Sequence, residues 1–189
     1  MKIGVLALQG DFKEHLEMLK KCEIDAVEVR LKEDLAKVDG LIIPGGESTT
    51  IGNLMSKSGI DNEIIKKYNQ GMPIYGTCAG AILLAKEIEG SIQPRLGLLD
   101  IKITRNSYGR QQDSFEACID LRNIGKVDGV FIRAPAIKNI SKNVDVLGRY
   151  ENNPVLVQQN NVLASTFHTE LTDDIKLHKY FVQMVRKTL

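Results

Sequence analysis

One cysteine of the chain, Cys78, lies where its thiol could act as a nucleophile. It stands in the segment Gly76-Thr77-Cys78-Ala79-Gly80, after an apolar run and before a helix-like run over residues 81–88. A sharp turn from strand to helix needs small neighbours, because a Cβ beside the turn would clash with the approaching backbone. At a helix start, unpaired backbone N–H groups and the positive end of the dipole favour a thiolate. The segment therefore predicts a nucleophile elbow with a reactive thiol.

The other two cysteines lack this setting. A free cysteine is usually buried and inert, and we interpret Cys22 and Cys118 in that way. Cys22 closes a helical stretch, Cys118 alternates with Phe115 and Ile119 in strand-like sequence, and neither has a glycine on both sides. Only Cys78 is a candidate nucleophile.

A cysteine nucleophile needs a base, and the base needs a group that fixes its tautomer. Of the three histidines, His15 and His178 fall in helix-like segments and are interpreted as helix-surface or packing residues, whereas His168 follows a strand-like run. Glu170 comes two residues later, and in extended chain this spacing points both side chains to one face. Alone, the pair is more typical of a solvated strand end. Together with the elbow it predicts a triad of Cys78, His168 and Glu170.

A glycine-rich segment at residues 44–48 follows a buried strand and opens a helix, so its glycines can turn backbone N–H groups inward. Acyl transfer from an amide develops negative charge on the carbonyl oxygen, and one preorganised donor is worth ~10²–10³ in rate. The amides of Gly46 and Ala79 are the donors we expect. The alternatives are a glycine turn with Ser48 or Thr49 as the helix N-cap, and a phosphate cradle, although the lysine and spacing of a P-loop are missing.

The elements that position these residues alternate between strand and helix in the first half of the chain. Apolar runs and amphipathic stretches cover residues 2–8, 12–22, 26–31, 40–43, 50–56, 64–68 and 72–75. Leu41-Ile42-Ile43 is apolar at consecutive positions, which suits a parallel strand covered on both faces. This pattern predicts a doubly wound sheet. Ligands of such sheets bind beyond the carboxyl ends of the strands, so residues 9–11, residues 44–50 and the elbow are candidate walls of one site.

The second half is richer in strands. Strand-like runs cover residues 101–104, 115–121, 130–132, 144–150, 154–159 and 162–166, with turn signals between them. A last helix is expected over about residues 173–187, with Thr172 as its N-cap. We therefore predict an α/β fold with a doubly wound, mostly parallel central sheet flanked by helices and some antiparallel strands in the second half.

Composition narrows the function further. At 189 residues the chain suits one domain, over residues 1–189. Its 25 basic and 24 acidic residues form no run of like charge, which argues against nucleic acid or an anionic membrane as partner. No segment reaches the ~20 apolar residues of a membrane helix, and the N-terminal apolar stretch is too short for a signal peptide. We expect a small substrate and a reducing cytoplasm, where free thiols persist.

The motifs resemble those of class I (triad) glutamine amidotransferases, which share a Gly-x-Cys-x-Gly elbow, a downstream His-x-Glu and a glycine-rich oxyanion strand. Longer segments are similar to the family of glutaminase subunits of pyridoxal 5′-phosphate synthase. The elbow is common to the superfamily, whereas Arg-Asn-Ser at 105–107 and Phe-Ile-Arg-Ala-Pro at 131–135 are far more specific. The similar segments are residues 4–10, 44–50, 76–80, 105–111, 113–116 and 130–135.

This resemblance implies hydrolysis of L-glutamine to L-glutamate and ammonia. Cys78 would attack the side-chain amide carbon and form a glutamyl thioester, His168 would protonate the ammonia and then activate water, and Glu170 would orient His168. Arg105 and Arg133, which would otherwise be interpreted as surface ion pairs, become substrate holders. The residues implied to hold glutamine are Gly46, Glu47, Ser48, Arg105, Ile132 and Arg133.

The resemblance also implies a partner and no cofactor or metal ion. Ammonia would pass to a synthase subunit that builds pyridoxal 5′-phosphate from two sugar phosphates, within a hetero-oligomeric complex that activates the glutaminase. Residues 9–11 and 106–111 are the candidate contact or activation elements. One departure is Thr169, which stands where the superfamily usually has proline. It lacks proline's fixed φ, so we expect a less rigid pair of His168 and Glu170.

The residues themselves leave two alternatives open. One is a stand-alone cysteine hydrolase that acts on another amide or γ-glutamyl substrate. The other is a non-catalytic binding or regulatory module, in which Cys78 is merely packed and the glycine loop holds an anion.

Overall fold

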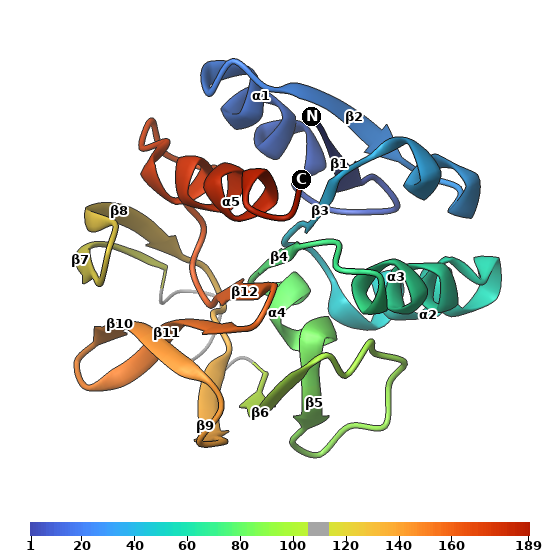
Figure 1. Ribbon diagram of the computed structural model, residues 1–189. Coiled ribbons are helices and arrows are strands. Elements are labelled where there is room, and N and C mark those ends of the chain that lie inside the picture. Colours follow the sequence, from blue (N-terminus) through green and yellow to red (C-terminus); the bar gives the residue numbers. More distant parts are fainter. Residues whose placement is uncertain (106–113) are drawn as a thin grey trace.

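The computed structural model describes residues 1–105 and 114–189; the expected contact element at residues 106–111 lies outside these ranges. A nine-stranded sheet in the order β2-β1-β3-β4-β12-β11-β10-β7-β8 crosses the molecule (Figure 1). Its parallel part comprises β2 (Asp25–Val29), β1 (Lys2–Leu6), β3 (Gly40–Ile43), β4 (Ile74–Thr77) and β12 (Val162–Ser165). The antiparallel part comprises β11 (Asn153–Gln159), β10 (Asp145–Tyr150), β7 (Phe115–Leu121) and β8 (Gly125–Phe131).

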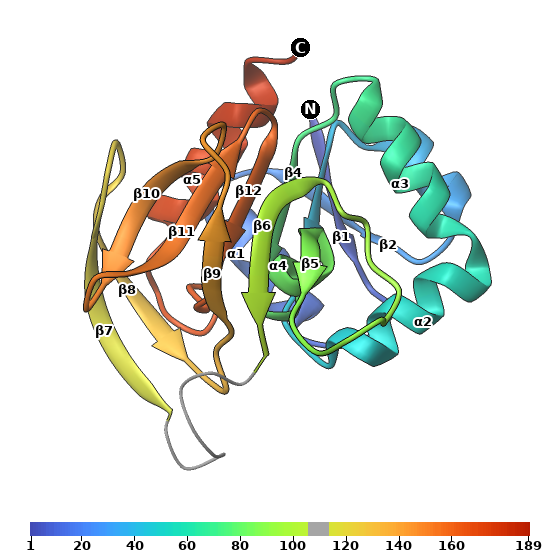
Figure 2. The same cartoon turned by 90° about the horizontal axis from the view of Figure 1, so that it is seen from below.

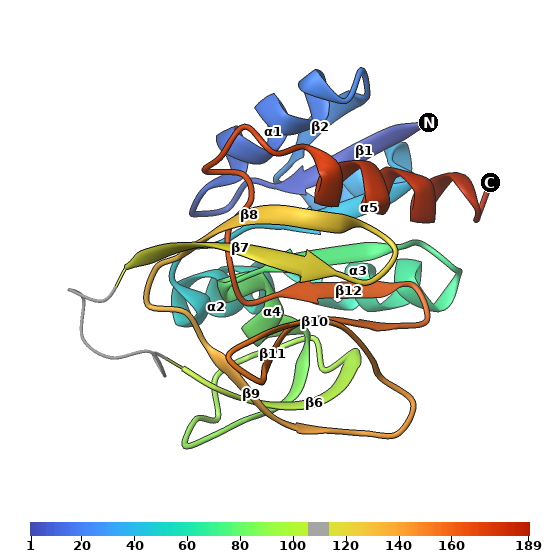
Figure 3. The same ribbon diagram turned by 90° about the vertical axis from the view of Figure 1, so that its left-hand side faces the viewer.

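Helices cover both faces of the parallel strands (Figures 1 and 3). On one face lie α1 (Phe12–Lys21) and α5 (Lys176–Arg186), and on the other lie α2 (Ser48–Ser58), α3 (Ile60–Asn69) and α4 (Ala79–Leu84). Successive residues of β3 belong to opposite cores, because Leu41 and Ile43 pack with α2 to α4 while Ile42 packs with α1 and α5. This two-sided burial explains the continuous apolar run and confirms the predicted doubly wound sheet.

A smaller sheet packs beside α4 (Figure 2). It consists of β5 (Ala85–Ile88), β6 (Leu99–Thr104) and β9 (Ala136–Ile140), in the order β5-β6-β9. The predicted helix-like run over residues 81–88 is therefore wrong in its second half. The apolar sequence suits a buried helix and a buried strand equally, and pairing of Ala85 with Leu99 and of Ile88 with Ile103 decides for a strand.

The last helix begins later than the sequence predicts. Thr172 accepts a hydrogen bond from the Asp174 amide at 3.0 Å, and the Asp174 carboxylate in turn accepts from the Lys176 amide at 2.9 Å. These side chains form a turn before the helix, so α5 begins at Lys176 and Thr172 is not its N-cap. The remaining element is a 3₁₀ helix at Lys32–Lys37. Within the described ranges, no helix is long and apolar enough to cross a membrane.

Candidate active site

Cys78 lies at the turn from β4 into α4, as the elbow motif predicts. Its backbone has φ 47° and ψ −99°, a conformation that non-glycine residues rarely adopt and that is typical of strained functional turns. A Cβ at Gly80 would lie 2.1 Å from the Ile43 carbonyl oxygen, and one at Gly76 would lie 2.6 Å from the backbone of Gly80. Strand β3, the turn and α4 approach so closely that only glycine fits at both positions.

His168 follows β12 and is fixed by an isolated antiparallel bridge to β8, the edge strand of the sheet. Its backbone exchanges two hydrogen bonds with Val130 of β8, at 2.8 and 2.9 Å. The imidazole Nδ1 lies 2.6 Å from Glu170 Oε1, and both residues are buried. Thr172 holds the intervening turn, because its amide and hydroxyl both donate to the Thr169 carbonyl oxygen, at 3.0 and 2.8 Å. These bonds provide an anchor for the turn that does not depend on proline at position 169.

The electrostatics of this pair favour an ion pair. Burial acts to lower the pKa of His168, but the Glu170 carboxylate and the Cys78 thiol raise it, and the pKa lies well above its usual value. Burial acts to raise the pKa of Glu170, but His15 and His168 hold it well below its usual value. Each group stabilises the charged form of the other. The Cys78 thiol contacts the His168 ring and also donates to the Ile132 carbonyl oxygen at 4.0 Å.

The glycine loop between β3 and α2 presents a free amide beside this group. The Asp11 amide donates to the Gly45 carbonyl oxygen at 3.1 Å. Because a trans peptide points its C=O and N–H in opposite directions, the Gly46 N–H faces away from Asp11. Among the residues that the structure describes, none accepts a hydrogen bond from Gly46. The Ala79 amide, in the first turn of α4, is one of the helix-start N–H groups that lack an intrahelical partner.

The helix after this loop is capped by Glu47 and not by either of the predicted alternatives. Glu47 is the N-cap of α2, and its carboxylate accepts from the amides of Thr49 at 3.3 Å and Thr50 at 2.6 Å. The predicted alternatives, Ser48 and Thr49, lie inside the helix. Arg105 binds the same carboxylate, with Nη2 3.1 Å from Glu47 Oε1, and donates from Nη1 to Thr49 and Gln93 at 3.0 Å each.

These residues line one cleft with a volume of about 410 Å³. Its walls come from the ends of β1, β3, β4 and β8 and from the segment after β12, as expected for an open α/β sheet. All predicted site residues line it except Ala79, which follows Cys78 in the chain, and Glu170, which is hydrogen-bonded to His168. The lining residues are Gln9, Gly10, Asp11, Gly46, Glu47, Ser48, Cys78, Ile82, Arg105, Ile132, Arg133, His168 and Leu171.

Comparison with known proteins identifies the family. The sequence profile described as the SNO glutamine amidotransferase family matches residues 5–187. The chain belongs to this family. A solved structure described as a glutamine amidotransferase superposes with a TM-score of 0.95 at 52% identity, covering 97% of this chain and 98% of that one. The predicted fold class is thereby confirmed.

Named relatives of this glutamine amidotransferase are called "Pyridoxal 5'-phosphate synthase subunit PdxT". The protein from Thermotoga petrophila is 50% identical over 98% of this chain and 100% of its own length. The one from Carboxydothermus hydrogenoformans is 48% identical over the full length of both. PurLQS from Thermotoga maritima has a TM-score of 0.73 over 96% of this chain and 97% of its own, at 17% identity, a likeness that shows the fold alone.

The junction at residues 9–11, predicted as a wall of the site, lines the glutamine amidotransferase cleft and adds two polar side chains to it. The Gln9 side chain accepts from the Glu47 amide at 2.8 Å, and Asp11 Oδ2 lies 3.7 Å from His168 Nδ1. Their position in the strand-to-helix junction at residues 9–11 was the available signal. Gln93, which binds Arg105, comes from the long connection between β5 and β6 and carries no motif. Asp11, His168 and Glu170 bring three metal-binding atoms within 4.8 Å, but the short bond between His168 and Glu170 already occupies two of them.

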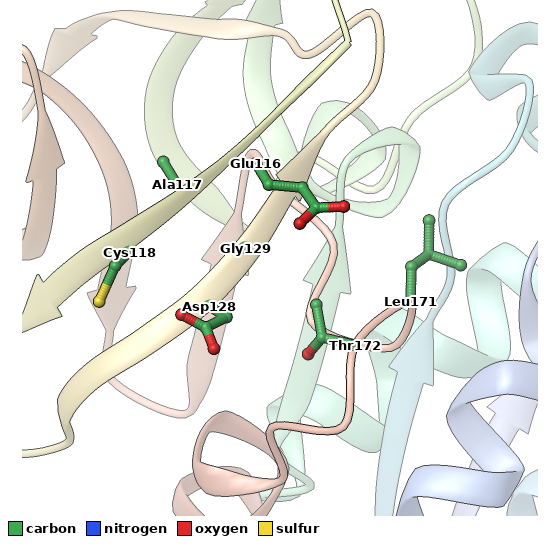
Figure 4. Close-up of a pocket in the computed structure, with 7 residues that line it drawn as sticks. All are labelled: Glu116, Ala117, Cys118, Asp128, Gly129, Leu171 and Thr172. Atoms are coloured by element: carbon green, nitrogen blue, oxygen red, sulfur yellow. The ribbon is translucent and has the colours of Figure 1, made fainter.

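A second cleft, of about 300 Å³, lies between the β7–β8 hairpin and the segment after Glu170 (Figure 4). Cys118 stands on its wall with an exposed side chain, so the interpretation of Cys118 as buried packing is wrong. Glu116 and Asp128 supply carboxylates, and no histidine lines the cleft. A thiol without an adjacent base is a poor nucleophile, which leaves Cys78 as the reactive candidate.

His15 and His178 are packing residues, the second of the two predicted alternatives, and not helix-surface residues. Both side chains are fully buried between the sheet and the helices α1 and α5. Burial, and then the neighbouring His15, lower the pKa of His178 from its usual value to about 3. His178 is therefore neutral in the folded protein over the ordinary pH range.

This lowered pKa predicts acid lability. Below pH 6.5 the unfolded chain binds a proton at His178 that the folded chain does not bind. This group therefore lowers the free energy of unfolding by about 1.4 kcal/mol for each unit by which the pH is decreased. Between pH 6.5 and 4.5, the free energy of unfolding in urea should fall less steeply for His178→Gln than for the wild type. Leu177→Val is the control, because it disturbs the same buried helix face without removing a titratable group. Equal slopes for wild type and His178→Gln would contradict the prediction.

Proposed function

We propose that this chain is the glutaminase subunit of a pyridoxal 5′-phosphate synthase. It hydrolyses L-glutamine to L-glutamate and ammonia and delivers the ammonia to a synthase subunit. The observation that carries the proposal is the cleft in which the Cys78 thiol meets a buried, hydrogen-bonded pair of His168 and Glu170. About 50% identity to PdxT proteins over nearly the whole chain supports the substrate and the partner.

The first half of the reaction releases ammonia. The raised pKa of His168 favours transfer of the thiol proton to its ring, and the Cys78 sulfur then attacks the side-chain amide carbon of glutamine. The amides of Gly46 and Ala79 stabilise the negative oxygen of the tetrahedral intermediate. His168 returns the proton to the leaving nitrogen, the C–N bond breaks, and a glutamyl thioester with Cys78 remains.

The second half regenerates the Cys78 thiolate. Neutral His168 takes a proton from water, and the resulting hydroxide attacks the thioester carbon. The amides of Gly46 and Ala79 again stabilise the negative oxygen of the intermediate. The C–S bond breaks, the new carboxylic acid releases its proton to solvent as glutamate leaves, and the Cys78 thiolate and protonated His168 are restored. Glu170 keeps the imidazole in one tautomer and stabilises its charge in both halves.

The proposal is tested by measuring glutamate and ammonia from glutamine, with this chain alone and with its synthase subunit added. We expect turnover in the assembled complex and little in the free chain. Full activity without any partner would favour a stand-alone hydrolase and contradict the assignment.

Arg105→Ala should weaken substrate binding more than it slows the chemistry. A guanidinium can grip the α-carboxylate of glutamine through two charge-assisted hydrogen bonds, each worth about 1.5–3 kcal/mol. We expect the KM for glutamine to rise by about 100-fold or more with a smaller change in kcat. Arg95→Ala is the matched control, because Arg95 binds the Lys86 carbonyl oxygen outside the cleft. An unchanged KM in Arg105→Ala would remove Arg105 from the binding site.

A further inference from the structure

The carboxylate of Glu170 is supported from behind by three residues that the proposed reaction does not use. Its Oε1 atom lies 3.4 Å from His15 Nε2 and accepts from the Thr77 hydroxyl at 3.4 Å. His15 Nε2 lies 3.1 Å from the same hydroxyl, and His15 Nδ1 lies 2.9 Å from His178 Nε2. All three residues are fully buried. A polar chain thus runs from α5 through α1 to the residue before Cys78.

The hydrogens of this chain can be arranged in one consistent direction. Thr77 has one hydroxyl hydrogen and can donate it to Glu170 only if it accepts from His15. His15 Nε2 also faces the negative Glu170 carboxylate, where a hydrogen is attracted and a bare lone pair is repelled. His15 therefore carries its hydrogen on Nε2.

The tautomer of His178 follows from its own surroundings. Its pKa, lowered to about 3, keeps it neutral, and a hydrogen on its Nε2 can be donated across 2.9 Å to His15 Nδ1, which is then the accepting lone pair. His178 Nδ1 is then a lone pair, and it has no hydrogen-bond partner among the described residues. A nitrogen with only a lone pair leaves no buried N–H group without an acceptor. The opposite arrangement would put a buried N–H at that position with nothing to accept it.

We propose that His15 is a positioning residue that holds the Glu170 carboxylate toward His168, and that His178 fixes the tautomer of His15. The triad then extends as an ordered hydrogen-bond chain from His178 through His15, with Thr77 bridging, to Glu170, His168 and Cys78. The expected effect of this hydrogen-bond chain on kcat rests on the proposed glutaminase function. The tautomers of His15 and His178 do not depend on that function.

Imidazole ¹⁵N NMR of the whole chain tests the tautomers directly. The protein has three histidines, so single substitutions assign every ring. We expect His15 and His178 to be neutral with the hydrogen on Nε2, and His168 to carry a hydrogen on Nδ1. A hydrogen on His15 Nδ1, alone or together with one on Nε2, would overturn the proposal.

Kinetics in the complex with the synthase subunit test the positioning role. We expect His15→Leu to lower kcat by about 10- to 100-fold, the usual effect of removing a group that orients a functional side chain, with KM unchanged. His15→Gln, whose amide can present an N–H near the former Nε2, should recover most of the loss. Leu19→Val is the control, since it loosens the same helix core without removing any member of the hydrogen-bond chain.

The outcomes separate this proposal from the proposed function. Equal losses in His15→Leu and His15→Gln, or a loss matched by Leu19→Val, would show a merely structural role. If His15→Leu fails to fold, the Gln variant and the NMR tautomers still decide. An inactive wild-type complex with the expected tautomers would instead contradict the glutaminase assignment alone.

Discussion

Cys78→Ala is expected to abolish glutamine hydrolysis in the assembled complex, with a loss of about 10³-fold or more. Without the sulfur no thioester forms, and the amides of Gly46 and Ala79 together with substrate binding support only residual catalysis. The substitution removes a single atom that forms no disulfide. Unfolding of the variant in urea should therefore remain close to that of the wild type, and this measurement separates a lost nucleophile from a lost fold.

The other two thiols provide matched controls. Cys22 is half-buried at the end of α1 and Cys118 is exposed on β7, so Cys22→Ala and Cys118→Ala should retain full activity. A general alkylating reagent should modify the exposed Cys118. A glutamine-shaped electrophile should instead modify Cys78 in the complex, which mass spectrometry can locate. Wild-type turnover by Cys78→Ala would refute the thioester mechanism, and failure to label Cys78 would favour a non-catalytic module.

The parts of the site that the sequence predicted are those in which the geometry is local. The glycines around Cys78 fix the elbow within five residues, and His168 and Glu170 are two residues apart, so a local turn after the strand suffices to bring them into contact. The apolar run at residues 41–43 likewise reports burial on both faces of β3. Each of these patterns carries its structural reason in neighbouring residues, so no tertiary contact had to be known.

Other features could not be predicted because distant residues decide them. His15 and His178 are 163 positions apart and meet only when α1 and α5 pack on the same face of the sheet. Residues 85–88 have apolar ends that fit a helix, yet they form a strand because they pair with β6. Glu47 caps α2 while Arg105 also binds its carboxylate. Local sequence propensity contains no information about any of these three features.

Glu170→Gln should lower kcat by about 10²- to 10⁴-fold at neutral pH, although it barely changes the shape of the side chain. The three groups around Glu170 all meet Oε1, and Oε2 has no partner among the described residues. A glutamine can therefore keep its carbonyl oxygen toward His168 and place its NH₂ group at the free position. The hydrogen bonds to the carbonyl oxygen survive, while the negative charge is lost and the buried NH₂ group has no acceptor among the described residues, so the stability of the variant is measured alongside its kcat.

That lost charge predicts a shift in pH dependence. Burial lowers the pKa of His168, and the Glu170 carboxylate is the largest effect that raises it. In Glu170→Gln burial should prevail, so His168 is protonated only at lower pH and lacks a proton for the leaving ammonia near neutrality. The kcat–pH profile of the complex should move toward acid. An additional loss in Glu170→Ala would then measure orientation separately from charge.

Asp11→Asn is the matched control, because Asp11 is the other carboxylate near His168, 3.7 Å from Nδ1 and 38% exposed. Water screens a partly exposed charge and weakens its effect on a neighbouring pKa, so Asp11→Asn should leave the kcat–pH profile nearly unchanged. The opposite pattern, with wild-type kcat in Glu170→Gln and an acid shift in Asp11→Asn, would transfer the charge-stabilising role to Asp11. Glu170 would then serve only to hold the imidazole in place, and the glutaminase would work through a carboxylate at the mouth of the cleft.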